Sequence, residues 1–353
     1  MLIFYYVFFF FFEIFFIFFA INQSFNEVLK SNMDETRSCF QLLKRAFEPF
    51  DCKHDSSKDK ERPFSVDKFP HCNLNIDKRK LIRCSILILL FQDETGQLNV
   101  ILTIRSYKLR SYPGQLCFPG GKYDSNLDDT YEETAYREAN EEIGLDKQNL
   151  LIIGKLCPII SPVGHYMVPI VGLLCNRKHP EVDTHDTCAI VKSLRANPDE
   201  VESIVRVPLS YFVNNAANPD VLMLNEERIR VHGFLGDYVR RFNMAESSDG
   251  MLPVKRLMVC IGDEYFDGVV PSLNALYGIN ATLLLFIAYL FESATCTSAS
   301  YADKLNTLNT LLEPFSITEY PKLIRMFSFN LYKNYLETKK ERSSTGLISR
   351  ARL

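Results

Sequence analysis

The chain has 353 residues, of which 47% are hydrophobic and 24% charged, the composition of an ordinary globular protein, and its length fits one catalytic domain with flanking segments. Its formal net charge of −3 excludes a general attraction to nucleic acid, so a polyanionic substrate must be met by local cations or by a metal. The ten cysteines include no C-x-x-C pair, which favours reduced thiols over a disulfide framework or a zinc site.

Residues 1–32 form an apolar leader that is rich in phenylalanine, and Glu13 is the only charge before residue 22. Three interpretations are open. Translation begins at Met33 and the leader is not part of the working protein, or the leader is a membrane anchor, which the charge of Glu13 near its middle would make costly. The third is a cleaved signal, although the basic residues that usually precede such an apolar region are missing. Contact with a membrane is expected only if the leader is real and retained.

Residues 33–80 predict an N-terminal helix followed by a linker. Apolar side chains recur at helical spacing after Met33, among them Phe40, Leu43 and Phe47. The stretch from residue 51 to residue 80 is charged and broken by prolines, which is typical of a linker.

Residues 81–292 begin with the pattern of a β-hairpin. Apolar runs at 83–91 and 98–105 predict two buried strands, and a third strand is expected at 115–118. Pro119-Gly120-Gly121 should end that third strand sharply.

A helical pattern follows at 130–143, and Gly144 should end that helix. Three later runs predict further strands, at 150–156, 167–174 and 202–208. The apolar run at 279–291 is too short for a membrane span and predicts a buried helix. A C-terminal extension at 293–353 is expected to begin with amphipathic helices. These elements together predict a mixed sheet with helices, an α/β (α+β) fold.

The helix at 130–143 carries three acidic residues that share a face, Glu138, Glu141 and Glu142, because positions three and four apart are neighbours on a helix. A solvated acidic face is the ordinary explanation of such clustering. The Pro-Gly-Gly loop before the helix favours the other explanation, in which these hard oxygen ligands bind magnesium beside substrate phosphates.

The segment from Arg137 to Leu145 resembles the Nudix hydrolase box, in which a glycine and a glutamate precede R-E-U-x-E-E-x-G-U and U is a bulky aliphatic residue. Two features depart from the box. Asp129 stands where the box has glutamate, and the loop between Gly121 and Asp129 is two residues longer than usual. The course of that loop is therefore open, whereas the helix that carries the glutamates is not affected.

Residues 101–121, from Ile101 to Gly121, resemble the signature of the coenzyme A branch of that family, and only Ile101 departs from it, for a leucine. Asn197-Pro-Asp-Glu-Val201 and the Val-Pro-Leu that follows it resemble a later segment of the same branch. The resemblance covers residues 81–292 and implies the Nudix fold, a mixed β-sheet sandwiched between helices.

The resemblance implies a diphosphate held by Mg2+ (or Mn2+) and attacked by water. Glu138 and Glu142 should be metal ligands, and Glu141 a further ligand or the base that takes a proton from the water. Arg137 stands beside these residues in the catalytic motif, and it either contacts phosphate or fixes a carboxylate by a bidentate pair; we favour the second role.

Four residues upstream of the helix are candidates for substrate binding. Arg105 and Arg110, which form a cationic cluster with Lys108, suit the phosphates of coenzyme A, although a solvated basic loop is the ordinary explanation. Gly120 and Gly121 allow the backbone to approach the metal, although a plain tight turn is also compatible with them. Glu200 either acts in the site or caps the segment that follows it.

The sequence ends in Ala351-Arg352-Leu353, which follows the small-basic-leucine pattern of a peroxisomal address. A chance terminus is the alternative. Because the branch that the chain resembles includes peroxisomal enzymes, we expect a peroxisomal location and a peroxisomal import receptor as a partner, with membrane anchoring through residues 1–32 as the alternative.

These features predict a diphosphatase that cleaves coenzyme A or acyl-CoA into adenosine 3',5'-bisphosphate and (acyl-)4'-phosphopantetheine. One alternative is a Nudix hydrolase of another nucleoside diphosphate derivative, such as a dinucleotide or a sugar nucleotide. The other is a catalytically silent Nudix fold that serves as a binding module.

Overall fold

The computed structural model describes residues 39–52, 81–161, 164–175, 184–215, 218, 220–230, 251–266 and 274–295. The predicted leader, most of the linker, most of the C-terminal extension and the tripeptide Ala351-Arg352-Leu353 lie outside these residues. No helix within the described ranges is long and apolar enough to cross a membrane. The eight cysteines within them form no disulfide with one another. The predicted domain boundaries stay predictions.

A mixed eight-stranded sheet forms the centre of the molecule, with β1 (Ile82–Gln92) in its middle. β1 pairs antiparallel with β2 (Leu98–Arg105) and parallel with β7 (His165–Leu174). The main order is β3-β2-β1-β7-β5. The remaining strands of this sheet are β3 (Leu116–Cys117), β4 (Gly120–Lys122) beside β1, β5 (Leu150–Lys155), β6 (Ile159–Ile160) beside β7, and β8 (Val201–Pro208) beside β2. The residues from Ser85 to Phe91 are all buried, as a strand covered on both faces requires.

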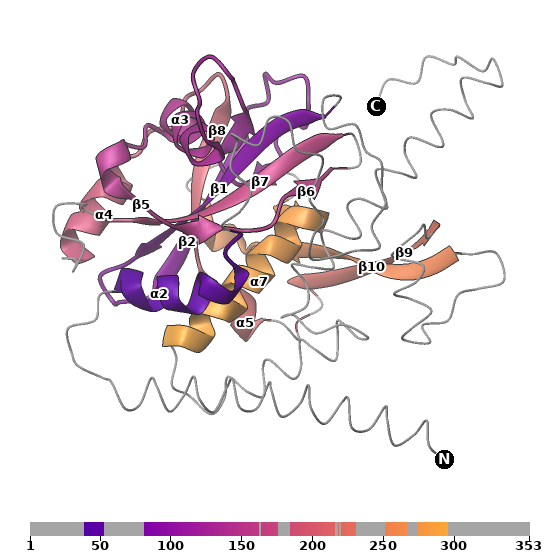
Figure 1. Ribbon diagram of the computed structural model, residues 1–353. Coiled ribbons are helices and arrows are strands. Elements are labelled where there is room, and N and C mark those ends of the chain that lie inside the picture. Colours follow the sequence, from indigo (N-terminus) through magenta and orange to yellow (C-terminus); the bar gives the residue numbers. More distant parts are fainter. Residues whose placement is uncertain are drawn as a thin grey trace, which may run out of the picture.

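Helices cover both faces of this sheet (Figure 1). α3 (Tyr131–Ile143) and α4 (Thr184–Ser193) lie on one face. The other face is covered by α2 (Cys39–Phe47), α5 (Leu209–Asn214) and α7 (Gly278–Thr295). Short 3-10 turns occur at Glu48–Phe50, Lys147–Asn149 and Asp263–Tyr265. The predicted α+β fold with a mixed sheet between helices is confirmed.

Alternate side chains of β1 enter two separate cores. Leu87 and Leu89 pack with Ala139 of α3 in one hydrophobic cluster, whereas Ile88 packs with Phe47 of α2 in the other. This alternation is the period of two that a strand imposes. It places the acidic helix α3 and the apolar helix α7 on opposite sides of the same strand.

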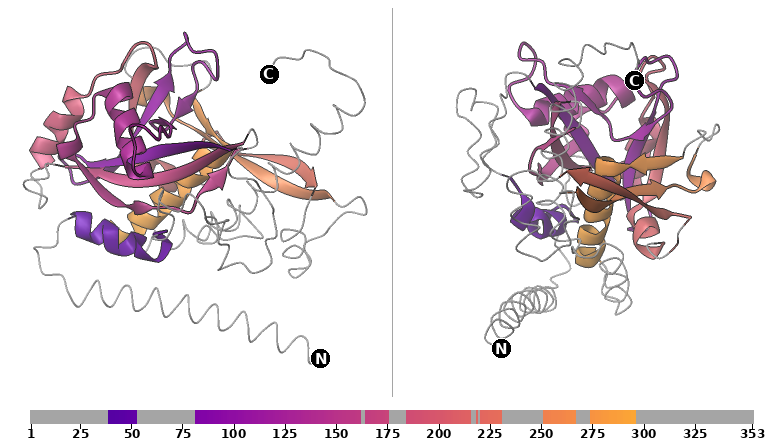
Figure 2. Two further views of the ribbon diagram at one scale, coloured as in Figure 1. Left: turned by 45° about the horizontal axis from the view of Figure 1, so that its top comes forward. Right: turned by 90° about the vertical axis from the view of Figure 1, so that its right-hand side faces the viewer.

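A second, three-stranded antiparallel sheet was not predicted from the sequence. It consists of β9 (Leu222–Arg230), β10 (Met251–Cys260) and β11 (Ala275–Tyr277), in the order β11-β10-β9. β9 and β10 extend away from the main body in the views of Figures 1 and 2. α4, α5 and β6 were not predicted either.

The predicted end of the third strand before Pro119-Gly120-Gly121 is confirmed, since β3 ends at Cys117, but the strand that follows at once was not predicted. The two glycines begin β4, in which Gly120 lies opposite Ile86 and Gly121 opposite Ser85 of β1. Gly120 has a φ of 151°, and a Cβ at this position would overlap the backbone of Ser85 and Ile86. Glycine is therefore what allows a second partner strand to pair with β1 here.

Candidate functional site

α3 is fixed at both ends and oriented by one apolar row. At its start, Thr130 Oγ1 accepts a hydrogen bond of 3.1 Å from the N–H of Glu133, and the Glu133 carboxylate accepts one of 3.2 Å from the N–H of Thr130. The helix ends at Gly144, as predicted. Ala135 and Ala139 are fully buried against the sheet, which sets the rotation of the helix and thereby the direction of its glutamates.

The backbone of β4 lies directly against two of these glutamates. The N–H of Gly120 donates a hydrogen bond of 3.1 Å to Glu142 Oε2. At Gly121 a Cβ would overlap the carboxylate of Glu138. Both glycines were predicted site residues, and in the structure their backbone lies against the two glutamates, at a distance that the lack of a Cβ permits.

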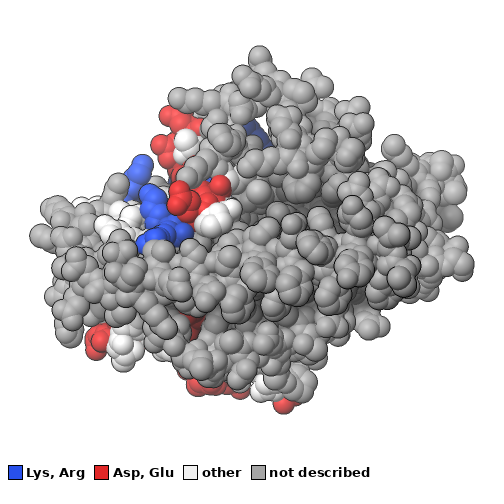
Figure 3. Space-filling view, turned by 60° about the horizontal axis from the view of Figure 1, so that its bottom comes forward, with Lys and Arg blue, Asp and Glu red and all other residues white. Residues whose placement is uncertain are grey.

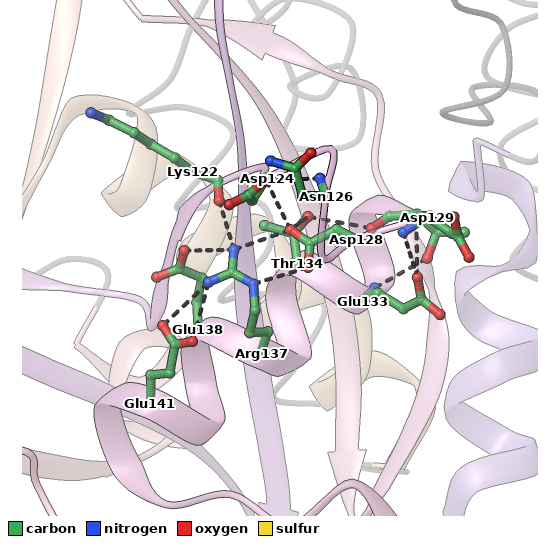
Figure 4. A network of polar contacts seen from close by, with 11 residues as sticks. Lys122, Asp124, Asn126, Asp128, Asp129, Glu133, Thr134, Arg137, Glu138 and Glu141 are labelled. Atoms are coloured by element: carbon green, nitrogen blue, oxygen red, sulfur yellow. Dashed lines mark hydrogen bonds and ion pairs between the residues drawn. The ribbon is translucent and has the colours of Figure 1, made fainter.

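Arg137 is the centre of a polar network that ties the loop before α3 to the glutamates (Figure 4). Its Nε and Nη2 donate hydrogen bonds of 2.9 and 3.0 Å to the two carboxylate oxygens of Asp128. Nη2 also donates to the carbonyl of Lys122 at 2.8 Å and lies 2.9 Å from Glu138 Oε1. Nη1 lies 3.2 Å from Glu141 Oε2. The guanidinium therefore fixes two carboxylates of the acidic face relative to β4.

Asp128 is a site residue that the sequence did not single out. It is buried, and Thr134 Oγ1 donates to it at 2.9 Å and the Asp124 N–H at 3.0 Å. Burial opposes its ionisation, but the hydrogen bonds from Arg137 and its neighbours outweigh burial and lower the pKa of Asp128. Asp129, which stands at the motif position, is exposed and donates its backbone N–H to Glu133.

The two inner glutamates are protonated more readily than ordinary glutamates. Burial raises the pKa of Glu142 to about 8, and the charges of Glu138 and Glu200 add to this effect. Burial also raises the pKa of Glu138, with contributions from Glu141 and Glu200 that oppose the effect of Arg137. Negative charge is thus concentrated in a poorly hydrated place, where a proton or a cation stabilises it.

Glu200 joins this cluster from a distant part of the chain. The turn before β8 is bound to the end of α3, because the N–H of Asn197 donates to the carbonyl of Glu142 at 2.9 Å. The carbonyl of Glu200 accepts from the N–H of Ser106, also at 2.9 Å. Since the charge of Glu200 acts on both Glu138 and Glu142, the structure favours the site over a simple cap for this residue.

The predicted cations upstream take different places. Arg105 is half-buried, and its charge lowers the pKa of Glu142 against the larger effect of burial. Lys108 forms an exposed ion pair of 2.9 Å with Asp199, and Arg110 is exposed. The structure therefore brings Arg105 to the glutamates and leaves Arg110 at the surface of the same loop.

The donors of this site suit a hard divalent cation such as Mg2+ or Mn2+, because they are carboxylate oxygens. Within the described ranges, no group of three or more His, Cys, Asp or Glu side chains is already gathered to hold a metal ion. Instead, the carboxylates of Glu138 and Glu141 contact Arg137, and the carboxylate of Glu142 accepts a hydrogen bond from Gly120. A bound cation would compete with these contacts for the carboxylate oxygens.

Charges of both signs also meet on the surface. On the face drawn in Figure 3, the described lysine and arginine side chains lie directly beside aspartate and glutamate side chains. A polyanion that approaches this face meets no extended surface of positive charge among the described residues.

Comparisons with known proteins identify the family of this part of the chain. Residues 82–222 match the profile of the NUDIX domain. The chain is 31% identical over 201 residues to the peroxisomal coenzyme A diphosphatase ndx-8 of Caenorhabditis elegans, an alignment that covers 57% of this chain and 75% of that relative. It is 38% identical over 120 residues to the peroxisomal coenzyme A diphosphatase NUDT7 of Mus musculus, which covers 34% of this chain and 44% of that relative.

Among solved structures, the chain is similar to a crystal structure of a Nudix hydrolase from M. smegmatis, RenU. The identity is 17% and the TM-score 0.28, with 38% of this chain and 74% of that chain covered. The profile match and the identity to ndx-8 over three quarters of its length carry the assignment. The chain belongs to the Nudix family of hydrolases, which act on phosphoanhydrides.

Proposed function

We propose that the chain hydrolyses the diphosphate of coenzyme A or acyl-CoA with Mg2+ (or Mn2+), yielding adenosine 3',5'-bisphosphate and (acyl-)4'-phosphopantetheine. One observation carries this proposal. The loop after β2 lies in the segment that resembles the signature of the coenzyme A branch, and it is bound through Ser106 to Glu200 of the glutamate cluster. The two relatives that are named coenzyme A diphosphatases support the same substrate.

Glu138 and Glu142 would hold the cation, since they are the two buried or half-buried carboxylates beside β4. A magnesium ion supplies charge neutralisation for the diphosphate and lowers the pKa of bound water. Glu141 is the more exposed carboxylate, with 47% of its side chain accessible. It would therefore take the proton from the attacking water onto its carboxylate, or bind a further cation.

Arg137 acts in this proposal as a positioning residue. Its N–H groups already donate hydrogen bonds to Asp128 and to the carbonyl of Lys122, and its ion pairs orient Glu138 and Glu141. A bidentate arginine pair gives such an arrangement geometric definition. The alternative role predicted from the sequence, direct contact with phosphate, would require these bonds to break.

Four upstream residues would bind the substrate. Arg110 is exposed and suits the 3'-phosphate of coenzyme A, whereas Arg105 lies near the glutamates and suits the diphosphate. Gly120 and Gly121 let the β4 backbone lie against the carboxylates that hold the cation.

A peroxisomal location is part of the proposal, because both named relatives are described as peroxisomal. The predicted import receptor would bind Ala351-Arg352-Leu353. Residues 337–353 attached to the C-terminus of a fluorescent protein should direct it to peroxisomes, and changing Leu353→Asp should abolish that import.

A substrate panel tests the substrate class. We expect kcat/KM for coenzyme A or an acyl-CoA to exceed that for ADP-ribose, a dinucleoside polyphosphate and a sugar nucleotide, with both products identified by mass. A higher kcat/KM for another diphosphate would retain the Nudix assignment and reject coenzyme A. Absence of turnover on the whole panel with Mg2+ and with Mn2+ would favour the silent binding module.

A further inference from the structure

Tyr112 has a backbone conformation that tyrosine rarely adopts. Its φ is 55°, and within the described ranges it is the only residue other than glycine with a positive φ. A left-handed conformation is unfavourable for a bulky side chain. Burial of the ring does not offset this strain, because 56% of Tyr112 is exposed. Because packing of the ring does not compensate the strained backbone of Tyr112, we infer that this tyrosine serves a function other than stabilising the loop.

The loop that carries Tyr112 is closed by two backbone hydrogen bonds of 2.9 Å. The N–H of Arg105 donates to the carbonyl of Gln115, and the N–H of Gly114 donates to the carbonyl of Arg105. The ring of Tyr107 lies against Gly114 and remains 50% exposed. The loop thus presents two tyrosine rings outward on a closed backbone.

Direct contacts connect this loop to the glutamate site. Arg105, whose charge acts on Glu142, donates from its Nε to the carbonyl of Ser111 at 3.3 Å, next to Tyr112. At its other end, the loop is bound through Ser106 to Glu200. The exposed guanidinium of Arg110 is two residues from Tyr112. An exposed aromatic residue therefore lies on the same short loop as a cation beside the glutamates and a cation at the surface.

We propose that Tyr112 stacks on the adenine ring of the substrate and that the loop of residues 106–114 is the nucleotide subsite. This inference rests on the proposed function, since it assigns one half of coenzyme A to a place. An aromatic face stacks on any base, and neighbouring arginines bind its phosphates. Adenosine 3',5'-bisphosphate carries both kinds of group, whereas 4'-phosphopantetheine carries no ring.

The test measures binding of adenosine 3',5'-bisphosphate and of 4'-phosphopantetheine to the full chain with Mg2+ by calorimetry. Tyr112→Asn removes the ring but tolerates the left-handed backbone, Tyr112→Gly removes both ring and strain, and Tyr112→Phe keeps the ring. A stacked base contributes about 1–3 kcal/mol, or about 5- to 150-fold in affinity. We expect that loss for the nucleotide in the Asn and Gly variants, a change of less than about twofold in the Phe variant, and unchanged affinity for 4'-phosphopantetheine in all three.

The melting temperatures of the Asn and Gly variants should equal or exceed that of the wild type, so that unfolding does not explain weaker binding. Three results would overturn the proposal: wild-type affinity for the nucleotide in both variants, equal loss for the two ligands, or no nucleotide binding by the wild type. Failure of the proposed function is a separate observation, because it shows as intact coenzyme A and the binding measurement requires no turnover.

Discussion

Single residues decide how the acidic face of α3 is arranged. Arg137 connects Asp128, Lys122, Glu138 and Glu141, so the orientation of two glutamates depends on one guanidinium. The sequence predicted the glutamates and a bidentate role for Arg137. It did not predict Asp128 as the partner, because the loop before α3 is longer than the family motif and its course is set by side-chain contacts with α3, such as the hydrogen bond from Thr134.

Asp128→Asn should lower kcat/KM by about 10- to 100-fold, the usual effect of losing a residue that orients a metal ligand. The substitution replaces one acceptor oxygen with a donor, which faces the donors of Arg137 or of Thr134. Asp129→Asn is the matched control, since Asp129 is exposed. Steady-state kinetics should show little change in the control, and equal activity of the two variants would contradict the role of Asp128.

Glu142→Gln should abolish hydrolysis and yet stabilise the metal-free protein at neutral pH. Because burial raises the pKa of Glu142 to about 8, the folded state holds its proton where the unfolded state has released it. Stability is then unaffected below the ordinary glutamate pKa and falls as pH rises toward 8, by about 1.4 kcal/mol per pH unit at most. Glutamine carries no such charge.

Urea unfolding in the presence of a chelator checks this prediction. Wild type and Glu142→Gln should have similar free energies of unfolding near pH 4, and the variant should be the more stable near pH 8. The variant Glu94→Gln, on an exposed turn, should follow the wild type at both values. A Glu142→Gln protein that is less stable near pH 8 would be inconsistent with a buried, raised-pKa carboxyl.

At the scale of elements, the sequence predicted those whose patterns are local and strong. β1 and α7 contain continuous apolar runs, β2 is mostly apolar, and α3 has a regular apolar row that ends at Gly144. β10 was missed because Pro253 and the charged pair Lys255-Arg256 interrupt its apolar pattern. The pairing of β4 with β1 was missed because it joins two segments that are far apart in the sequence. Two glycines permit this pairing, but a pair of glycines does not by itself indicate a strand.

The N-terminal helix α2 should be required for the stability of the catalytic body. Phe47 is fully buried in the core that β1 shares with α7, and its ring lies 6.3 Å from that of Phe291. Phe47→Ala should therefore reduce the free energy of unfolding by about 3–5 kcal/mol. Gln41→Ala, on the exposed side of the same helix, should change it by less than about 0.5 kcal/mol. Similar values for the two variants in denaturant unfolding would mean that α2 is dispensable.

At the scale of the whole molecule, three segments that are separate in the sequence meet at the candidate site. β4 supplies glycines, α3 supplies glutamates, and the turn before β8 supplies Glu200. The sequence placed the first two together through a motif. Glu200 remained open between the site and a cap, because only the folded sheet brings β8 beside β2 and the end of α3.

This convergence predicts that binding of Mg2+ depends on pH. On the proposal that Glu142 holds the cation, the cation displaces the proton of Glu142, so its apparent affinity should increase with pH, by up to about tenfold per unit, and level off above about pH 8. Calorimetric titration with Mg2+ between pH 6 and 9 in two buffers of different ionisation enthalpy should detect the released proton. Affinity that is constant over this range would contradict a protonated Glu142 in the metal-free site.

The most direct test of the central claim is hydrolysis of coenzyme A with Mg2+ by the wild type and by Glu141→Gln, Glu142→Gln and Glu94→Gln, with the products identified by mass. We predict adenosine 3',5'-bisphosphate and 4'-phosphopantetheine from the wild type and from Glu94→Gln. We also predict a loss of about 10²- to 10⁴-fold in kcat for Glu141→Gln and no detectable product from Glu142→Gln. Intact coenzyme A with the wild type, or undiminished cleavage by Glu142→Gln, would contradict the account.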